Sequence, residues 1–459
     1  MTDIKIGLET HVQLNTNSKL FCSCRNEQNV EPNTNVCPIC LGHPGSKPRA
    51  NKEVINQAFK VCKALELDFN EESVFARKTY FYPDMSKNYQ VTQYDRPVAQ
   101  NGRFEVKIKD KKKEIGIKRL HIEEDPARLV HEENYSKVDY NRAGTPLLEI
   151  VTDPDLKSSE EARTYLQQLA HVLEYLKVYS PVSDYSIKSD ANISINGGER
   201  VEIKNITGTS AIEKALNYEL SRQKQLTKRN KEVKQHTRRY NPDMGSTIKM
   251  REKETEEDYG YIVDPDLTTQ KSKDVSNVEI PELPREKYRR FKKDYEIKDK
   301  IAESLVSDPG LAKAYEKLAQ KHDTHIAATL LTGDLKKVLN YNDVAYSEAK
   351  LEIDWLSHLL ELIEENRISD RNAEKALREI VENPRPIKEI IEELGLEKSS
   401  DDKVAQAVNK VIKNEEEAVK DYTSGDEGAI NYLVGQVMQV TQGGADPKKT
   451  RELLLEELE

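Results

Sequence analysis

Apolar and polar residues alternate in several short segments of the first two hundred residues, a pattern typical of β-strands. In IKIGLETHVQL, which begins at Ile4, the apolar residues fall on one face while Glu9, His11 and Gln13 fall on the other. The segments RLHIEED, SIKSDANISI and RVEIKN repeat this alternation, and Gly, Asn, Asp and Pro separate the segments as far as about Leu283. This part of the chain is therefore predicted to be mainly antiparallel β-sheet with a few helices.

Beyond residue 285 the apolar residues recur at helical spacing instead. The change follows a polar segment, 268–284, that closes with two prolines, and a second polar break occurs at 399–402. We therefore predict an α+β protein with a sheet domain at 1–285, a helical domain at 286–400 and a small all-α tail at 401–459. Asp446-Pro447 is predicted to cap the last helix. The helical pattern rests on four groups of residues: Trp355, Leu356, Leu359, Leu360 and Ile363; Ala373, Ala376, Leu377, Ile380 and Val381; Val404, Ala407, Val408, Val411 and Ile412; and Ile430, Leu433, Val434, Val437 and Met438.

Charge and composition narrow the classes of function. The formal net charge is -10, which argues against a protein that coats nucleic acid indiscriminately. Any RNA contact should then come from a local basic surface. No apolar run is long enough to span a bilayer, and the N-terminus lacks the pattern of a leader peptide, so we expect a cytoplasmic protein.

Four of the five cysteines are crowded between residues 22 and 40. Cys22 and Cys24 form one pair and Cys37 and Cys40 a second, and the loop between the pairs can return the chain to one tetrahedral ion. We expect a structural zinc site; four reduced thiols without a metal are the alternative. Cys62 stands alone in a helical segment and is predicted to be a core residue rather than a nucleophile.

The polar faces of the four strand segments carry the candidate chemistry. A solvated sheet face would produce the same alternation, but here two histidines and several carboxylates accompany isolated lysines. Carboxylates are ligands for Mg²⁺, and lysines neutralise phosphate charge, so the mixture favours a cation that bridges phosphate oxygens. No P-loop or protein-kinase signature is present, so ATP would bind by an uncommon route. The residues concerned, besides Glu9 and His11, are His121, Glu123, Glu124, Lys188, Asp190, Asn192, Glu202 and Lys204.

Read as longer motifs, the same segments resemble the GatB family across nearly the whole chain. The tail segment NYLVGQVMQVTQGGADP, from residue 431, is similar to the C-terminal tRNA-binding tail of that family. The matching motifs are IGLETHVQL at 6, CPICLGHPG at 37, ARKTYFYPDMSKNYQVTQYDRP at 76, GIKRLHIEEDPARLVH at 116, VDYNRAGTPLLEIVTDPD at 138, SDANISI at 189 and VEIKN at 201.

The resemblance implies an N-terminal cradle domain, a helical domain and a tail domain that work with the subunits GatA and GatC. GatA would release ammonia from glutamine. This chain would use ATP to phosphorylate the side-chain carboxylate of Glu or Asp esterified to tRNA(Gln) or tRNA(Asn), and ammonia would displace the phosphate. The chain lacks a nucleophile elbow and a Cys nucleophile with a partner base, which agrees with this division of labour.

By the same resemblance, Glu9, His11, Glu123 and Glu124 match the positions that hold Mg²⁺ and the nucleotide, with Asp190 and Lys204 as further nucleotide contacts. Lys78 and Lys87 match lysines that line the phosphate side of the pocket and the mouth of the ammonia tunnel; a surface ion pair is the alternative for both. Pocket and scaffold roles both remain open for Arg142, Asn205, Glu202 and Lys204.

The chain also departs from the family pattern. Gly260 stands in DYGYIVDPDL where many relatives have an arginine, so a substrate contact of that arginine cannot be transferred. The chain has no room for the synthetase-like insertion of GatE subunits, so the resemblance points to GatA and GatC, not GatD.

Two basic regions are candidates for tRNA contact, with a solvated surface as the alternative for each: the stretch 222–239, and Lys448, Lys449 and Arg451 at the start of the last helix. The alternative to an enzyme is a zinc-containing adaptor that binds tRNA and delivers it to a catalytic partner. The sequence does not distinguish Glu-tRNA from Asp-tRNA as the substrate.

Overall fold

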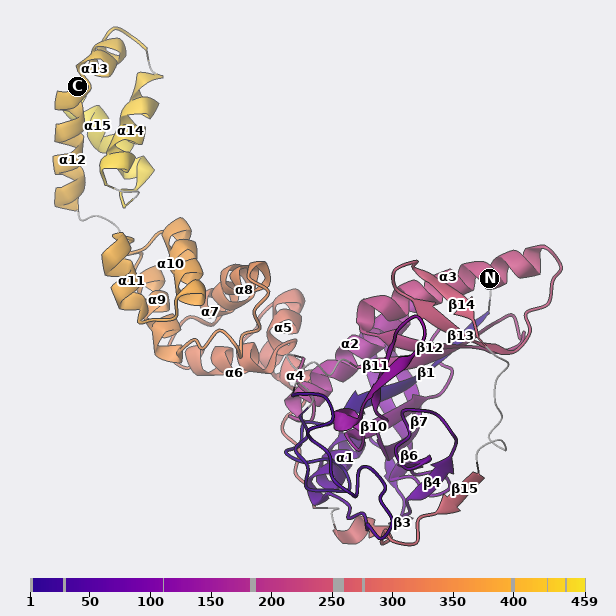
Figure 1. The fold of residues 1–459 in the computed structure, drawn as a ribbon. Coiled ribbons are helices and arrows are strands. Elements are labelled where there is room, and N and C mark those ends of the chain that lie inside the picture. The colour runs from indigo at the N-terminus through magenta and orange to yellow at the C-terminus, as the bar shows by residue number, and fades with distance from the viewer. Residues whose placement is uncertain are drawn as a thin grey trace. The chain divides into compact units, whose positions relative to one another are not determined.

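The computed structural model contains two compact units, Met1–Leu283 and Pro284–Glu459 (Figure 1). The predicted α+β class is confirmed, with the strands in the first unit and helices throughout the second. The structure describes residues 3–27, 30–109, 111–181, 187–250, 260–274, 277–397, 401–426, 428–441 and 444–458.

A large sheet forms the centre of the first unit, with nine strands among the described residues. The first strand of the chain, β1, lies in its interior, where β11 pairs with one edge of β1 and β10 with the other. In sheet order the strands are β14 (Ser246–Lys249), β13 (His236–Asn241), β12 (Val201–Thr207), β11 (Lys188–Ile195), β1 (Ile4–Gln13), β10 (Pro146–Thr152), β7 (Lys111–Glu124), β6 (Ala99–Ile108) and β2 (Asp68–Phe69).

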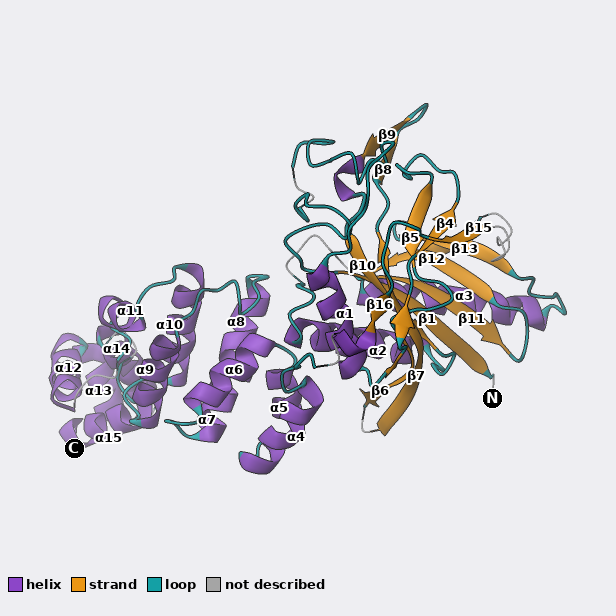
Figure 2. Cartoon of the chain, turned by 90° about the horizontal axis from the view of Figure 1, so that it is seen from below, coloured by secondary structure: helices purple, strands orange, loops and turns teal. Residues whose placement is uncertain are grey.

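The described strands of this sheet pair in the predicted antiparallel manner, apart from β12 and β13, which run parallel. Parallel neighbours need a crossover connection, and the helix α3 (Thr209–Lys228) supplies it. The helix α2 (Ser159–Tyr175) makes a similar crossover from β10 to β11. Both helices run along the sheet (Figures 1 and 2).

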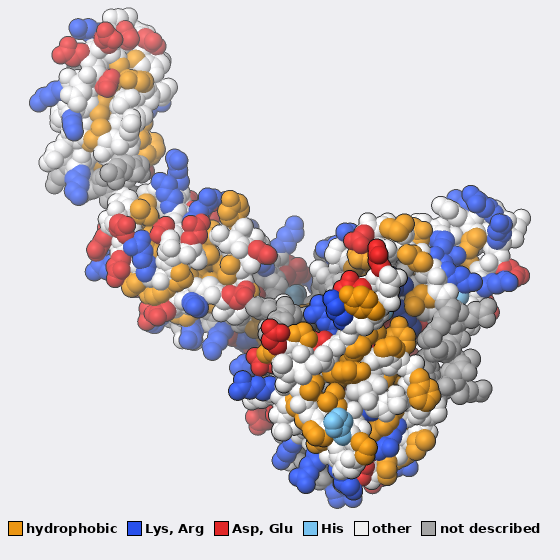
Figure 3. All heavy atoms as spheres, in the orientation of Figure 1, with side chains coloured by type: hydrophobic (Ala, Val, Ile, Leu, Met, Phe, Trp, Pro, Cys, Tyr) orange, Lys and Arg blue, Asp and Glu red, His pale blue; other side chains and the backbone are white. Residues whose placement is uncertain are grey.

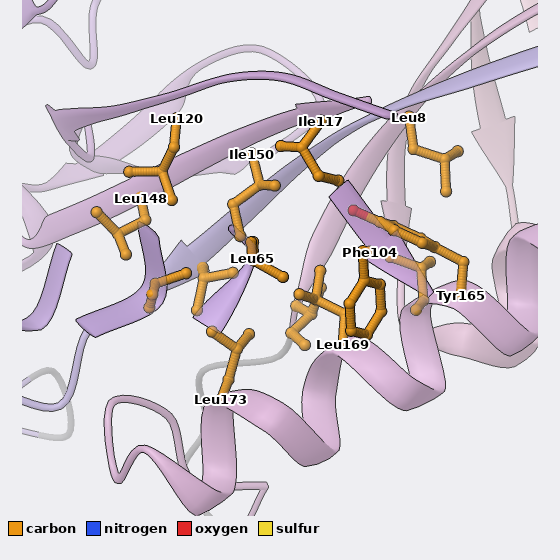
Figure 4. Packing of buried hydrophobic residues seen from close by; sticks show 14 of the residues in the cluster. Leu8, Leu65, Phe104, Ile117, Leu120, Leu148, Ile150, Tyr165, Leu169 and Leu173 are labelled. Atoms are coloured by element: carbon orange, nitrogen blue, oxygen red, sulfur yellow. The ribbon is translucent and has the colours of Figure 1, made fainter. Parts of the chain in front are cut away.

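The core of this unit lies between the sheet and α2. Leu8, Ile117 and Ile150 point from their strands toward Leu169 on the helix (Figure 4). The ring of Phe104 meets that of Tyr165 edge to face, with centroids 5.8 Å apart. Because successive side chains of a strand point to opposite faces, the polar residues Glu9 and His11 of β1 lie on the face away from α2.

Smaller elements surround the polar face. A three-stranded sheet in the order β15-β4-β5 lies against the end of β7, and two pairs of strands, β16 with β3 and β8 with β9, complete the described strands. Their bounds are β3 (Glu72–Ser73), β4 (Ala76–Thr79), β5 (Tyr89–Thr92), β8 (Arg128–His131), β9 (Ser136–Asp139), β15 (Gly260–Val263) and β16 (Gln270–Lys271), with α1 (Lys52–Ala64), η1 (Tyr140–Arg142) and η3 (Ser272–Asp274) as further helices.

The second unit is helical, as predicted. Its last helix begins at Pro447, and the Asp446 carboxylate accepts hydrogen bonds from the backbone of Lys448 and Lys449, which confirms the predicted cap. The helices are α4 (Pro284–Asp294), α5 (Asp299–Val306), α6 (Pro309–Leu318), α7 (Thr324–Thr329), η4 (Leu330–Leu335), α8 (Lys336–Tyr341), α9 (Ile353–Glu364), α10 (Asp370–Glu382), α11 (Ile387–Leu394), α12 (Asp401–Asn414), α13 (Glu416–Thr423), α14 (Ala429–Val440) and α15 (Pro447–Leu458).

The last four helices pack around a cluster of their own, with Val408, Leu433 and Leu454 at its centre. The predicted division at residue 400 falls on residues outside those the structure describes, as does part of the polar break at 399–402, so that boundary stays a prediction. None of the described helices is both long and apolar enough to cross a membrane.

A buried imidazole joins the turn between α6 and α7 to the helix α9 in the second unit. His322 contacts the Glu364 carboxylate through Nδ1 at 3.0 Å and the Ser357 hydroxyl through Nε2 at 2.6 Å, and its side chain is only 4% exposed. We expect His322→Ala to lower the free energy of unfolding of this unit by about 1–3 kcal/mol, because the buried Ser357 hydroxyl and the partly exposed Glu364 carboxylate lose their contacts with the imidazole.

Fluorescence of the single tryptophan, Trp355 on α9, would follow this unfolding in urea. The matched control is His325→Ala, which removes an exposed imidazole from the same segment and should change the free energy of unfolding by less than about 0.5 kcal/mol. Equal midpoints for the two variants would contradict the structural role of His322.

Candidate functional site

Five ionisable side chains from three adjacent strands meet on the polar face of the large sheet. In the paired register, His11 of β1 lies opposite Glu149 of β10, and Glu149 lies opposite His121 of β7. Glu9 and Glu123 lie two residues along their strands from these histidines and share the same face. We call Glu9, His11, His121, Glu123 and Glu149 the central cluster.

The distances within the central cluster are short. His11 Nε2 lies 3.5 Å from a Glu149 oxygen, 3.6 Å from Glu123 and 3.9 Å from Glu9. His121 Nε2 lies 3.1 Å from Glu149 and 3.7 Å from Glu123. Glu149 thus contacts both imidazoles and joins the two halves of the cluster.

The side chains of the central cluster shift one another's pKa values. The neighbouring Glu149 carboxylate, together with burial, raises the pKa of Glu9 to about 7. Burial lowers the pKa of His11, but its interactions with Glu149 and Glu123 outweigh burial and raise that pKa to about 10. In the same way, burial opposes and Glu149 and Glu123 raise the pKa of His121, to about 9. Burial acts to raise the pKa of Glu149, yet the two imidazoles hold it well below its usual value.

This donor set fits a divalent cation. Glu9, His11 and Glu149 form one group, and His121, Glu123 and Glu149 a second, whose ligand atoms all lie within 4.8 Å of one another. Carboxylate oxygens are the ligands that Mg²⁺ prefers, and a cation would relieve the repulsion that raises the pKa of Glu9. His121 Nδ1 is buried with no hydrogen-bond partner among the described residues, so the ring is held through Nε2 alone.

Sequence reasoning missed Glu149. It is the one charged residue in the strand segment PLLEIVT and is only 6% exposed. An isolated carboxylate within an apolar run rarely becomes fully buried without a partner, and this was the available signal.

Glu124, predicted as a cation ligand, lies on the opposite face of β7 from Glu123 and outside the central cluster. Its carboxylate accepts hydrogen bonds from Lys87 Nζ at 2.5 and 2.7 Å and from the backbone of Val91 at 2.8 Å. Lys87 and Glu124 are therefore a buried ion pair, with side chains 9% and 5% exposed. Lys78 lies on β4, opposite Gln90 of β5, and its ammonium is 6.0 Å from the centre of the Tyr80 ring.

Asp190 and Lys204 lie on the other side of Glu9. Asp190 is opposite Glu9 in the register of β11 with β1, and Lys204 Nζ is 3.3 Å from Asp190 and 3.7 Å from Glu202. These carboxylates, despite the opposing effect of burial, raise the pKa of Lys204 and keep it cationic. Asn205 donates its backbone N–H to Asp190 at 3.0 Å, so it supports the Asp190 carboxylate through its main chain.

Arg142 shapes the loop that follows Glu124. Its guanidinium donates to the backbone carbonyls of Pro126 at 2.9 Å and Ala127 at 2.7 Å, and it lies 3.5 Å from Asp125. These contacts favour a scaffold role. Gly260 begins the edge strand β15, opposite Thr79, while the first two residues of DYGYIVDPDL lie outside the described residues.

Four of the five cysteines, Cys22, Cys24, Cys37 and Cys40, lie together, as the spacing suggested. Their sulfurs lie within 4.8 Å of one another. Sulfurs about 2.3 Å from a tetrahedral zinc ion stand about 3.8 Å apart, and Cys37 Sγ and Cys40 Sγ are 3.8 Å apart. The fully buried Lys19 places Nζ 3.9 Å from Cys40 Sγ, and Cys62 lies in the core, as predicted.

The hydrogen bond from Cys22, the backbone of Cys37 and the charge of Lys19 together lower the pKa of the Cys40 thiol to about 5, against the opposing effect of burial. A thiolate is the form that binds metal. The cysteine cluster can therefore bind a metal ion.

The two basic regions occupy surface positions. The stretch 222–239 covers the end of α3, the loop after it and the first half of β13. Lys448, Lys449 and Arg451 are exposed in the first turns of α15.

The sequence matches the GatB/GatE catalytic domain family over residues 4–276 and a second family, described as the GatB domain, over residues 313–458. Similar proteins, named as the B subunits of aspartyl/glutamyl-tRNA(Asn/Gln) amidotransferases, occur in several archaea. That of Methanospirillum hungatei is 44% identical over 467 residues, which cover 99% of this chain and 98% of the relative. The Haloquadratum walsbyi protein is 42% identical over 479 residues, 99% of this chain and 97% of the relative.

These matches extend through the strands of the central cluster, the cysteine cluster and the helical unit alike. The first family match alone covers more than half of the chain, and identity above 40% holds over nearly its whole length. The chain therefore belongs to the GatB family.

Proposed function

We propose that this chain is the catalytic GatB subunit of a tRNA-dependent amidotransferase, which converts Glu-tRNA(Gln), Asp-tRNA(Asn) or both into the amidated forms. The observation that carries the proposal is the convergence of His11, Glu123 and Glu149 on one face of three adjacent strands. A merely solvated face would not bury carboxylates among imidazoles at such short distances.

In this proposal, Glu9, His11, Glu123 and Glu149 hold Mg²⁺, which neutralises charge on the phosphates of ATP. Lys204, next to Asp190, provides a fixed cation for the phosphate groups on the β11 side. Catalysis of this kind depends on positioned charge more than on a covalent nucleophile of the protein.

The reaction has two stages. An oxygen of the side-chain carboxylate of the tRNA-bound Glu or Asp takes the γ-phosphoryl group of ATP, and ADP leaves. The lone pair of ammonia then forms a bond to the carbonyl carbon, and phosphate leaves with the electrons of the broken C–O bond. Only unprotonated ammonia is nucleophilic, and the proton that the nitrogen loses passes to the departing phosphate.

We further propose that the chain works in a complex with a glutaminase subunit, GatA, and a small subunit, GatC, in the cytoplasm. The relatives are named as one subunit of an amidotransferase that acts on tRNA, which supports an assembly of several subunits and a tRNA substrate. The tail formed by α12 to α15, with Lys448 and Arg451 exposed, is proposed to contact tRNA.

Replacing Glu149 tests the central cluster. We expect Glu149→Gln to lower kcat for tRNA-dependent ATP turnover by roughly 100-fold to 1000-fold, because one charge that positions the cation is lost. The assay would use the reconstituted complex with ammonia as nitrogen donor and a Glu-tRNA(Gln) or Asp-tRNA(Asn) substrate. The affinity for tRNA should stay within about twofold, since the change lies in the cation site.

The control is Glu199→Gln, which removes an exposed carboxylate from the turn between β11 and β12. Turnover by that variant should match the unaltered protein. If Glu149→Gln and Glu9→Gln both keep full turnover, the catalytic assignment is wrong and the tRNA adaptor is favoured.

Metal analysis tests the cysteine cluster. Purified protein should contain about one zinc ion per chain, held by Cys22, Cys24, Cys37 and Cys40. Cys37→Ser should lose the ion and unfold at a lower temperature, because a structural ion contributes to folding. Cys62→Ala, the control, should keep the ion, and a metal-free unaltered protein would refute the site.

A further inference from the structure

Basic side chains gather over the second half of α3 and the loop that follows it (Figure 3). We define the α3 basic surface by five exposed residues, Lys224, Lys228, Arg229, Lys231 and Lys234. It lies near the β14 edge of the sheet, because α3 leads into β13 and β13 pairs with β14.

The charge of this region opposes that of the chain. Residues 222–249 contain nine Lys and Arg and two Asp and Glu, a net charge of 9 − 2 = +7, whereas the whole chain carries -10. In the part of the chain that the structure describes, none of the five residues of the α3 basic surface forms an ion pair. Their charge therefore faces solvent without neutralisation.

Compensation of the helix dipole explains only part of this arrangement. Cations in the last turn of a helix stabilise it, which accounts for Lys228 and Arg229. Lys231 and Lys234 come after the helix has ended, and Lys224 precedes its last turn. The number of cations therefore exceeds what the helix end requires.

The loop that carries these residues is held in place. Asn230 adopts a left-handed conformation with φ of 52°, and the backbone N–H of Lys231 donates to Leu226 at 2.9 Å, which closes the end of α3. Val233 packs against the core, and the carbonyl of Lys234 contacts His236 Nδ1 at 2.5 Å. The basic side chains thus project from fixed backbone positions.

A buried carboxylate organises two more cations beneath this surface. Glu219 is fully buried, accepts hydrogen bonds from Arg222 at 2.6 and 2.9 Å, and lies 3.5 Å from Arg238. Arg238 also donates to the Thr247 hydroxyl at 2.7 Å. Two guanidiniums share one carboxylate, so an excess positive charge remains under the α3 basic surface.

We propose that the α3 basic surface binds the phosphate backbone of tRNA. The identity of the RNA rests on the proposed function; the preference for phosphate rests on the surface itself. A protein interface needs apolar anchors at its centre. The exposed large apolar residues nearby lie outside the α3 basic surface: Tyr218 is in the first half of α3, and Met244, Ile248 and Met250 are on or beside β14 and its turn.

Combined substitution of Lys228, Arg229 and Lys231 by Ala tests the proposal. The full-length chain would be titrated against a labelled tRNA(Gln) transcript at several salt concentrations. We expect Kd to rise about tenfold near 0.15 M salt, and the slope of log Kd against log salt to fall by about two, since each lost phosphate contact removes roughly 0.7–0.9.

A matched control removes three cations elsewhere in the same unit. Lys52, Lys111 and Lys118 are exposed, and two of them lie on β7, on the other side of β1 in the sheet order. Their combined substitution by Ala should leave Kd and the salt slope unchanged. Equal losses in the two triple variants would indicate a general charge effect and overturn the proposal.

Two further readouts separate the possible outcomes. Turnover at saturating tRNA should be unchanged in the Lys228, Arg229 and Lys231 variant. The catalytic role of the central cluster is therefore tested by Glu149→Gln alone, and the tRNA contact by the triple variant alone. An unchanged tRNA affinity together with loss of binding to the partner subunits would identify a protein interface and refute RNA binding.

Discussion

The pairing of β1 with β10 and β11 is the constraint on which the rest of the structure depends. Antiparallel register places His11 opposite Glu149 and Glu9 opposite Asp190, so the first strand brings charged groups from both sides together. The other face of the same strand carries Ile6, Leu8 and Val12, which are buried in the core. One alternating strand therefore anchors the hydrophobic core and the central cluster at the same time.

Local patterns in the sequence were sufficient to predict several features. Alternation alone placed Glu9 and His11 on one face, because side-chain direction within a strand depends only on the position along it. The apolar residues of α9, α10 and α14 predicted the helices of the second unit for a similar reason. The cysteine spacing predicted the proximity of the four thiols, because the loop between the two pairs is short.

Features that depend on strand order could not be predicted in this way. Glu149 enters the central cluster only because β10 lies between β1 and β7. Nothing within the segment PLLEIVT indicates which strands will pair with it. Glu123 and Glu124 are adjacent in sequence but face opposite sides of β7, so their contacts become distinguishable only when β5 is placed against the end of that strand. The parallel pairing of β12 with β13 likewise follows from the crossover by α3 rather than from either strand.

The length of β7 has a practical consequence. Its fourteen residues place the turn shared with β6 about 40 Å from Glu123, at roughly 3.3 Å per residue. A shift of the strand pairing by one residue near Glu123 would exchange the faces of Glu123 and Glu124. Residues added between Ile108 and Lys111, the last pair of the hairpin, would leave both side chains in place. The tip of this hairpin is thus a suitable position to insert an affinity tag or a fluorescent reporter into the working enzyme.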